Sequence, residues 1–183
     1  YYNSLKKADV AILDSGFFCI LLRLFKRYKV RKLSGYLFLK KFLNLKFSKK
    51  DRFLLIDPTR ADSKFNRIYL KKKKLLNVVS YVAPKYDTIQ DSKLLILIKK
   101  TKPKFILINL GGEVQEILAL YIKKNIKFNV TIFCTGAAIA FLTKRQAPIN
   151  DFIDKIYLGW FIRLLYNTKK YFKRILGSFK LIK

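Results

Sequence analysis

One stretch near the middle of the chain joins a strand-like run to a glycine pair and then to a helix-like run. Residues 105–116 read FILINLGGEVQE. The opening residues are apolar without alternation, which is typical of a strand covered on both faces. Gly111 and Gly112 then allow a sharp turn and a close approach of a ligand to the backbone. Together these features predict a phosphate-binding site, with an ordinary strand-to-helix crossover as the alternative interpretation.

The same succession of short apolar runs and longer helical patterns extends along most of the chain. We expect strands at residues 8–13, 51–56, 77–82, 104–109 and 129–134. We expect helices at residues 17–28, 36–45, 61–76, 88–100 and 113–124. This order predicts an α/β fold, a Rossmann-like and mainly parallel sheet flanked by helices. Ligands of such folds bind beyond the carboxyl ends of the strands, so the loops at 14–16, 57–60, 83–87, 110–113 and 135–138 are the first candidates.

The formal net charge of +29 on 183 residues restricts the partners. Such a field favours anionic partners, namely nucleic acid, acidic lipid or phosphorylated substrates. Lys greatly outnumbers Arg, and Ile, Asn, Phe and Tyr are abundant, so part of the charge reflects compositional drift on solvated faces. A basic nucleic-acid-binding module is one alternative function, although such modules tend to use Arg for bases and phosphates.

The sequence also argues against a metal site and a membrane-spanning segment. It has two cysteines, Cys19 and Cys134, far apart in apolar segments, and no histidine, so a zinc site is not expected. Reduced, buried thiols suit a cytoplasmic protein. The longest apolar runs, such as residues 17–22, are far shorter than the ~20 residues that span a bilayer. Because the chain begins at Tyr1 and contains no Met, we expect a fragment or a processed chain.

The composition changes near residue 155, which predicts an α/β domain over residues 1–154 and a tail over residues 155–183. The tail has eight Lys or Arg and no acidic residue. In a helix after Asn167, a suitable N-cap, apolar residues share one side and cations the other. Such a helix is expected to bind an anionic membrane surface, or instead to dock on the domain's own core. The expected membrane residues are Trp160, Lys169, Lys170, Lys173 and Arg174.

Five short motifs occur in the order of one enzyme family. Residues 8–16 (ADVAILDSG) match AD-x-x-x-x-DG, and residues 32–35 (KLSG) match R-x-x-G. Residues 111–116 (GGEVQE) match G-x-P-x-QE, with Val114 in place of the common Lys. Residues 136–148 (GAAIAFLTKRQAP) match GAAFDFLAG…RAP, and residues 158–164 (LGWFIRL) match GLEWLYRL. The chain therefore resembles the WecG/TagA/CpsF glycosyltransferases from about residue 8 to its end.

The sequence departs from the family pattern at several positions. Ala140 and Leu37 stand where the family carries acidic residues, and residues 57–65 lack the usual glycine-rich loop. The opening part of a typical family domain is also expected to be missing upstream. We therefore expect a divergent subgroup with its own substrate, with a non-catalytic envelope-assembly scaffold of the same fold as the alternative.

The resemblance implies an inverting glycosyltransferase of bacterial cell-envelope polysaccharide or teichoic acid biosynthesis. It would move an N-acetylhexosamine-type sugar from a UDP-sugar donor to an undecaprenyl-diphosphate-linked acceptor, without a metal or another cofactor. Direct displacement needs a carboxylate that takes the proton of the acceptor hydroxyl. By position Asp14 is the catalytic candidate, and capping of the helix that begins near Gly16 is its alternative role.

The diphosphate leaving group needs positive charge placed beforehand, which suits arginines and helix N-termini. The expected substrate-binding residues are Gly35, Gly111, Gly112, Gln115, Glu116, Gly136, Arg145, Gln146 and Arg163. The expected partners are the two substrates and an anionic membrane surface, without nucleic acid, and a homo-oligomer is an open alternative. The expected location is cytoplasmic, peripheral on the inner face of the cytoplasmic membrane.

Overall fold

The computed structural model describes residues 1–146, 159–166, 168, 172 and 177. Their framework is a four-stranded sheet in the order β2-β1-β3-β4. The strands are β1 (Phe53–Asp57), β2 (Val78–Val82), β3 (Phe105–Ile108) and β4 (Thr131–Cys134), and every neighbouring pair is parallel. The predicted α/β fold with a parallel sheet is thus confirmed, and these four strands lie close to the predicted bounds.

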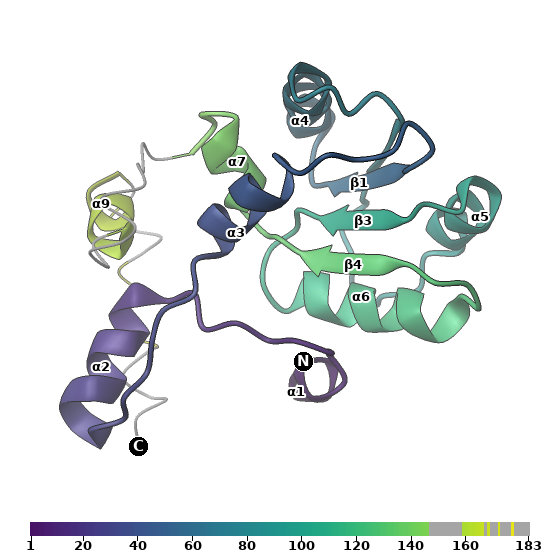
Figure 1. Cartoon of the computed structure of the whole chain (residues 1–183). Helices are drawn as coiled ribbons and strands as arrows, with labels where there is room; N and C mark the ends of the chain where they lie inside the picture. Colours follow the sequence, from purple (N-terminus) through teal and green to yellow (C-terminus); the bar gives the residue numbers. More distant parts are fainter. Residues whose placement is uncertain (147–158, 167, 169–171, 173–176, 178–183) are drawn as a thin grey trace.

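Three helices connect the strands (Figure 1). α4 (Arg60–Lys72) joins β1 to β2, α5 (Ser92–Thr101) joins β2 to β3, and α6 (Val114–Asn125) joins β3 to β4. The chain places β2 on one side of β1 and then returns to place β3 on the other side. The connections that follow β1 and β3 therefore lead to opposite sides of the sheet, and such a switch point is where open α/β sheets bind ligands.

Both faces of the sheet are covered by helices. One apolar core lies between the sheet and helices α5 and α6, and the other lies between the sheet and helices α3 (Gly35–Phe42), α4 and α7 (Ala138–Leu142). β1 contributes to both cores, because its side chains alternate between the two faces: Leu54 and Ile56 enter the first core, and Phe53 and Leu55 enter the second. This two-sided burial explains why the strand is apolar without alternation.

α3 lies along one face of the sheet and reaches from one end of the strands to the other. Phe42, at the end of α3, contacts the first residues of β1 and β3, with ring centroids 6.4 Å from Phe53 and 5.3 Å from Phe105. Tyr36, at the start of α3, contacts Phe141 of α7 at 6.3 Å. Because α7 follows the carboxyl end of β4, the N-terminus of α3 lies at the edge of the sheet where the strands end. We call this the carboxyl edge.

The predicted strand at residues 8–13 is wrong. The segment joins no sheet, and Val10 is 79% exposed. It is held near its ends, where Lys123 of α6 pairs with Asp9 at 2.9 Å and the Leu33 amide donates to the Leu13 carbonyl at 3.0 Å. Within the described residues no strand runs beside it, so its backbone has no ladder to join. A short helix, α1 (Tyr2–Lys6), precedes the segment and contacts α6.

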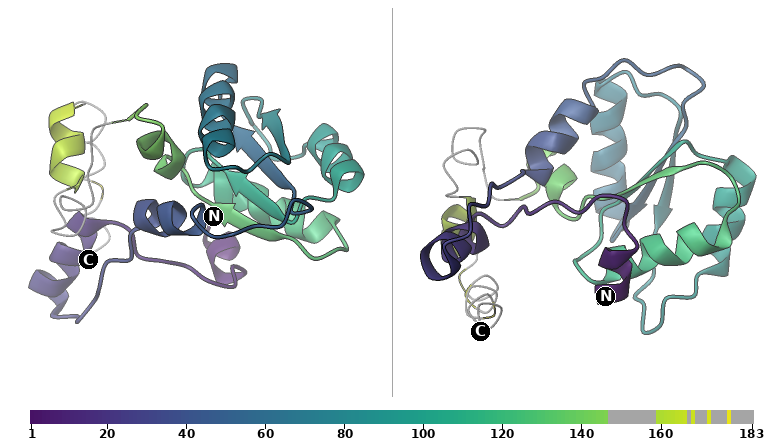
Figure 2. Two further views of the ribbon diagram at one scale, coloured as in Figure 1. Left: turned by 45° about the horizontal axis from the view of Figure 1, so that its top comes forward. Right: turned by 60° about the horizontal axis from the view of Figure 1, so that its bottom comes forward.

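α2 (Gly16–Lys26) projects from the α/β body, as Figure 1 and both views of Figure 2 show. Ser15 caps its N-terminus by accepting a hydrogen bond from the Phe18 amide. Beside it lies α9 (Gly159–Tyr166), whose Trp160 ring packs on Phe17 with 4.9 Å between centroids. α9 belongs to the tail predicted at 155–183. The helix expected after Asn167 falls outside the described residues and stays a prediction.

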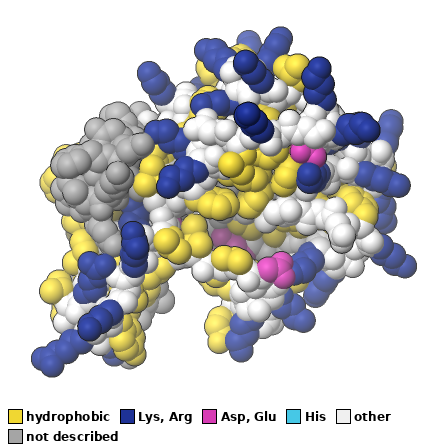
Figure 3. Space-filling view, in the orientation of Figure 1, with side chains coloured by type: hydrophobic (Ala, Val, Ile, Leu, Met, Phe, Trp, Pro, Cys, Tyr) yellow, Lys and Arg dark blue, Asp and Glu magenta, His cyan; other side chains and the backbone are white. Residues whose placement is uncertain are grey.

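Basic side chains are spread over the top, right and lower parts of the described surface, with apolar side chains between them (Figure 3). Acidic side chains are few on this face. The positive charge is therefore not confined to one element of the fold. Within the described residues, no helix combines the length and the apolarity needed to cross a membrane.

Phe42→Ala is expected to lower the free energy of unfolding by about 2–4 kcal/mol, because it removes the ring that fixes α3 to the sheet. Besides Phe53 and Phe105, this ring contacts Phe133 at 4.7 Å. Urea denaturation followed by circular dichroism measures the change. Phe25→Ala on the exposed surface of α2 is the matched control, expected to stay within about 0.5 kcal/mol of the unsubstituted chain. Equal effects of the two substitutions would contradict this anchoring role.

Candidate functional site

A buried carboxylate stands at the switch point of the sheet. Asp57, the last residue of β1, is fully buried. Its Oδ1 accepts hydrogen bonds from the side-chain amides of Asn66 in α4 and of Asn109 just after β3, both at 2.7 Å. The Thr135 hydroxyl, just after β4, donates to Asn109 at 2.6 Å. One chain of side-chain hydrogen bonds, the Asp57 network, thus joins the carboxyl ends of β1, β3 and β4 to α4.

Burial raises the pKa of Asp57 above its ordinary value, because desolvation disfavours the charged carboxylate. Asn109, Asn66 and Ser63 act in the opposite direction and lessen the increase, because they donate to the charged form. Oδ2 of Asp57 has no partner within normal hydrogen-bond geometry among the described residues. The nearby Ser63 hydroxyl therefore offsets only a small part of the desolvation of this oxygen. The network therefore holds, at the centre of the carboxyl edge, a buried carboxyl group whose charged form is disfavoured.

A second group of polar side chains lies at the same edge. Oε1 of Gln115 accepts from the Gly136 amide at 2.8 Å, and Nε2 of Gln115 donates to Glu116 at 2.8 Å. Gly136 has φ +51°, a left-handed conformation that suits glycine because it has no Cβ. The structure therefore brings together three of the residues expected to bind substrate, from the start of α6 and the loop after β4.

The turn before α6 differs from the expectation in one respect. Neither Gly111 nor Gly112 is left-handed, whereas Glu113 has φ +74°. The pattern G-x-P-x-QE has Pro at the position of Glu113, and the proline ring excludes this conformation. Both glycines are exposed, and a Cβ added to either would meet no atom within 4 Å. The turn therefore leaves open space beside the two glycines, just before the start of α6.

Asp14 is held at the N-terminus of α3. Its Oδ1 accepts from the Gly35 amide at 3.1 Å, and a Cβ added to Gly35 would lie 3.3 Å from Oδ2. The alternative role of Asp14 as the cap of α2 is wrong, because Ser15 fills that position. The exposed Asp14 side chain lies at the carboxyl edge, facing the positive end of the α3 dipole. This places two of the expected site residues in direct contact across 21 positions of sequence.

The remaining expected site residues are less closely connected to these groups. Arg145 lies over the Phe65 ring of α4 at 4.6 Å and pairs with Asp62 at 3.5 Å. Gln146 follows it and is half-buried. Arg163 belongs to α9, but its side chain lies outside what the structure describes. The four cations expected at a membrane, Lys169, Lys170, Lys173 and Arg174, also lie outside the described residues.

The two cysteines differ in their surroundings. Cys19 is buried, as expected, whereas Cys134 is exposed as a residue, which corrects the expectation for it. The reason is that β4 pairs only with β3 in the described sheet, so its residues are less covered than those of the central strands. The Sγ of Cys134 nevertheless donates to the Gln115 carbonyl at 3.5 Å, and burial of this atom raises the pKa of the thiol. Across the described residues, no three His, Cys, Asp or Glu side chains are grouped so that they could hold a metal ion.

Comparison with protein families identifies the family of the chain. The family described as Glycosyl transferase WecG/TagA/CpsF matches residues 1–182. The chain belongs to this family. It is therefore a glycosyltransferase, as the order of its motifs predicted. No curated protein gives a match in addition.

Sequence reasoning missed the Asp57 network of this glycosyltransferase. Asp57 is the last residue of β1, Asn109 and Thr135 come directly after β3 and β4, and parallel strands end at the same edge of a sheet. That recurring position was the available signal. Asn66 had no such signal, because only the packing of α4 beside β1 brings it to Asp57.

Asp57→Asn is expected to be at least as stable as the unsubstituted chain at neutral pH and to lose this advantage as the pH falls. Because the pKa of Asp57 is raised, ionising this carboxyl costs more free energy in the folded chain than in the unfolded chain, so Asp57 lowers stability above the unfolded pKa. That cost disappears as the pH falls through the raised pKa and is gone below the unfolded value of about 3.9. Urea denaturation of both proteins across this pH range measures the difference.

Asp57→Leu is the control for the hydrogen bonds. It leaves the amide donors of Asn66 and Asn109 without an acceptor, so it should lower the free energy of unfolding by about 2–5 kcal/mol at every pH. A stability difference between Asp57→Asn and the unsubstituted chain that does not change with pH would contradict the charged, buried state of Asp57.

Proposed function

We propose that this glycosyltransferase moves an N-acetylhexosamine-type sugar from a UDP-sugar to a lipid-diphosphate-linked acceptor in bacterial cell-envelope polysaccharide or teichoic acid synthesis. The family assignment supports a sugar transfer. The observation that carries the proposal for the site is the Asp14 carboxylate, which is exposed at the carboxyl edge and fixed there by the Gly35 amide at 3.1 Å.

In the proposed reaction, Asp14 accepts the proton of the acceptor hydroxyl. The acceptor oxygen forms its bond to the anomeric carbon while the bond from that carbon to the UDP oxygen breaks, which inverts the configuration. A fixed carboxylate suits this role because proton transfer requires the base within hydrogen-bond reach of the hydroxyl. The hydrogen bond to the Gly35 amide limits the motion of the carboxylate, which lowers the cost of orienting it.

The leaving diphosphate needs stabilisation as its negative charge develops. The open space at Gly111 and Gly112, beside the first amides of α6, supports binding at that turn. Arg145 is proposed as a cation for this diphosphate, because its ion pair with Asp62 is long at 3.5 Å and both side chains are partly solvated. Gln115 and Glu116 are proposed to hydrogen-bond the sugar or the nucleotide, with Gly136 keeping Gln115 in place. Arg163 and Gln146 remain proposals from the motifs.

Ala140 and Leu37 stand where the family carries acids, and neither belongs to the Asp57 network. The Leu37 amide donates to the Ser34 cap of α3, a role that does not depend on the side chain. Ala140 is half-buried in α7. These replacements leave the Asp14–Gly35 contact intact, which supports a transferase with altered substrate preference over a scaffold without activity.

The acceptor lipid cannot leave its bilayer, so the proposal includes attachment to a membrane surface on the cytoplasmic side. The basic tail at 155–183 is the proposed attachment, because cations and apolar side chains on one helix bind anionic surfaces. Of this tail, α9 is described, and its Trp160 ring is partly used in packing on Phe17.

Asp14→Asn is expected to lower sugar transfer by 10² to 10⁴, because the amide cannot accept the acceptor proton. The assay is UDP release from UDP-N-acetylhexosamines with a lipid-diphosphate-sugar acceptor, run in EDTA because no metal is proposed. Asp51→Asn removes the same charge at the opposite edge of the sheet, where Asp51 pairs with Lys104 at 2.8 Å, and should keep normal activity. Activity of Asp14→Asn within about threefold of the unsubstituted chain would refute the assignment.

Gly35→Ala is expected to reduce transfer about tenfold without loss of stability. The added Cβ would lie 3.3 Å from Oδ2 of Asp14, so the carboxylate must move by a few tenths of an ångström. Small displacements of a catalytic group cost substantial rate, whereas alanine is favourable in a helix. Transfer kinetics and urea denaturation separate the two effects. A loss of stability equal to the loss of activity would instead indicate that Gly35 is needed for folding.

A further inference from the structure

α2 and the segment that follows it form a limb outside the α/β body (Figures 1 and 2). We call residues 16–31 the α2 limb. Its packing partner among the described elements is α9, through Phe17 and Trp160. No strand of the described sheet lies beneath it (Figure 1). The side chains at its far end are therefore placed toward the surroundings of the protein rather than toward its core.

The far end of the α2 limb is densely basic. A hollow of about 640 Å³ is lined by Arg23, Arg27, Lys29 and Arg31, together with Tyr28 and Val30. The four cations are all exposed. Nε and Nη2 of Arg23 donate to the Val30 carbonyl at 2.9 and 2.6 Å, which folds the segment back against the end of α2. Arg23 thus fixes the backbone that carries Lys29 and Arg31 close to the end of α2.

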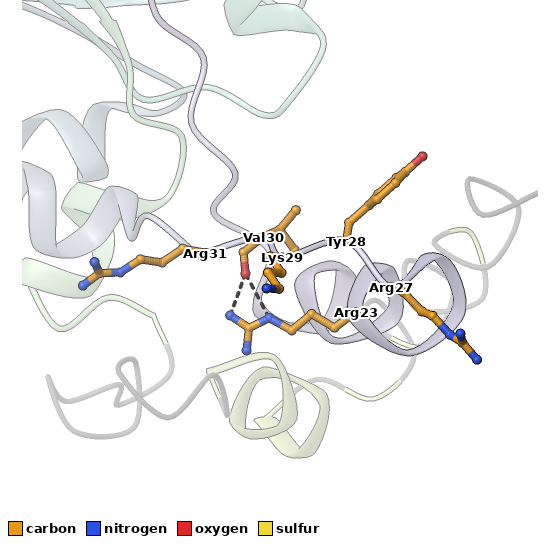
Figure 4. Close-up of a pocket in the computed structure, with 6 residues that line it drawn as sticks. All are labelled: Arg23, Arg27, Tyr28, Lys29, Val30 and Arg31. Carbon is orange, nitrogen blue, oxygen red and sulfur yellow. Dashed lines mark hydrogen bonds between the residues drawn. The ribbon is translucent and has the colours of Figure 1, made fainter.

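The arrangement of these cations suits a surface better than a single small anion. Figure 4 shows the guanidinium groups of Arg31, Arg23 and Arg27 spaced along the limb, with Arg27 pointing away from the other two. A site for one free phosphate needs donors that converge on one position. A surface that carries many separate negative groups can meet all of these cations at once.

The same limb exposes large apolar side chains. Leu24 is 70% exposed, Phe25 61% and Tyr28 60%, next to the basic residues in sequence. Aliphatic side chains such as Leu24 contribute little binding free energy to a nucleic acid, which is bound through the charge of its phosphates and the stacking of its bases. At a bilayer surface they enter the boundary between headgroups and acyl chains while the cations meet the headgroups.

We propose that the α2 limb binds the surface of an anionic phospholipid bilayer, with its cations on headgroup phosphates and with Leu24, Phe25 and Tyr28 in the interface. This contact is separate from the tail at 155–183 and does not depend on the sugar transferred. α9, the described helix of the tail, packs on the same limb, so these two helices lie on one side of the molecule. Asp14 comes two residues before α2, so the limb also holds the proposed base near the bilayer.

The test is sedimentation of the intact chain with phosphatidylcholine vesicles that contain or lack phosphatidylglycerol. A triple variant, Arg27→Gln with Lys29→Gln and Arg31→Gln, is compared with a control triple on α4, Lys64→Gln with Arg67→Gln and Lys71→Gln. The α4 residues line a separate basic hollow of about 560 Å³, and both triples lower the formal charge of +29 by three. Each cation at an anionic surface contributes about fivefold, so the limb triple should bind about a hundredfold more weakly. The α4 triple should stay within about threefold.

A second variant tests the apolar half of the proposal. Leu24→Ser with Phe25→Ser is compared with Leu76→Ser with Ile96→Ser, whose side chains are 74% and 66% exposed on other elements. Salt screens the charges but not apolar burial, so the limb pair should lose binding at high salt as well as at low salt. The control pair should not. This arm keeps the proposal testable if circular dichroism shows that the limb triple is misfolded.

Three outcomes would overturn the proposal. Equal weakening by the two triples would mean that net charge alone draws the chain to vesicles. Competition by inorganic phosphate at low concentration would indicate a site for a free anion. Loss of binding to single-stranded RNA by the limb triple, with vesicle binding unchanged, would indicate a nucleic-acid surface. Failure of the Asp14 assignment would leave vesicle binding unaffected, so the two proposals are tested separately.

Discussion

The two-sided burial of β1 and β3 is the constraint on which the rest of the structure depends. Each strand sends alternate side chains into a different core, so helices must cover both faces of the sheet. In β1 and β3, polar side chains therefore occur only where the strands end. Asp57, Asn109 and Thr135 occupy those ends, and their hydrogen bonds hold the loops of the carboxyl edge in register. The same packing that excludes water from the strands therefore concentrates the polar chemistry at one edge.

α3 connects this core to the chemistry proposed for the glycosyltransferase. Its last turn is fixed by Phe42 on the first residues of β1 and β3, and its first turn receives Asp14 through the Gly35 amide. A helix anchored at one end by aromatic packing thus positions a carboxylate at the other end. This explains how a residue from a segment without sheet contacts is placed with some precision at the carboxyl edge.

The strongly positive charge has different consequences in different parts of the molecule. On α4 the cations line a hollow beside β2, on the α/β body, whereas on the α2 limb they stand outside that body next to exposed Leu24 and Phe25. Cations beside exposed apolar side chains favour a bilayer interface, and the limb presents both on a projection. Location on the fold, rather than net charge, therefore distinguishes the surfaces.

The amino-acid sequence by itself determined the α/β class, the four strands of the sheet and the family, because apolar runs and glycine turns are local signals. It also indicated Gln115 and Gly136, although their contact at 2.8 Å needed the packing of α6 beside β4. It misplaced residues 8–13 as a strand, because a short apolar run in the sequence does not show whether a sheet edge is available. Only the tertiary structure decided the Asp57 network, the contact of Asp14 with Gly35 and the exposure of the α2 limb. Each of these joins or separates segments far apart in the chain, and such long-range geometry leaves no periodic trace in the sequence.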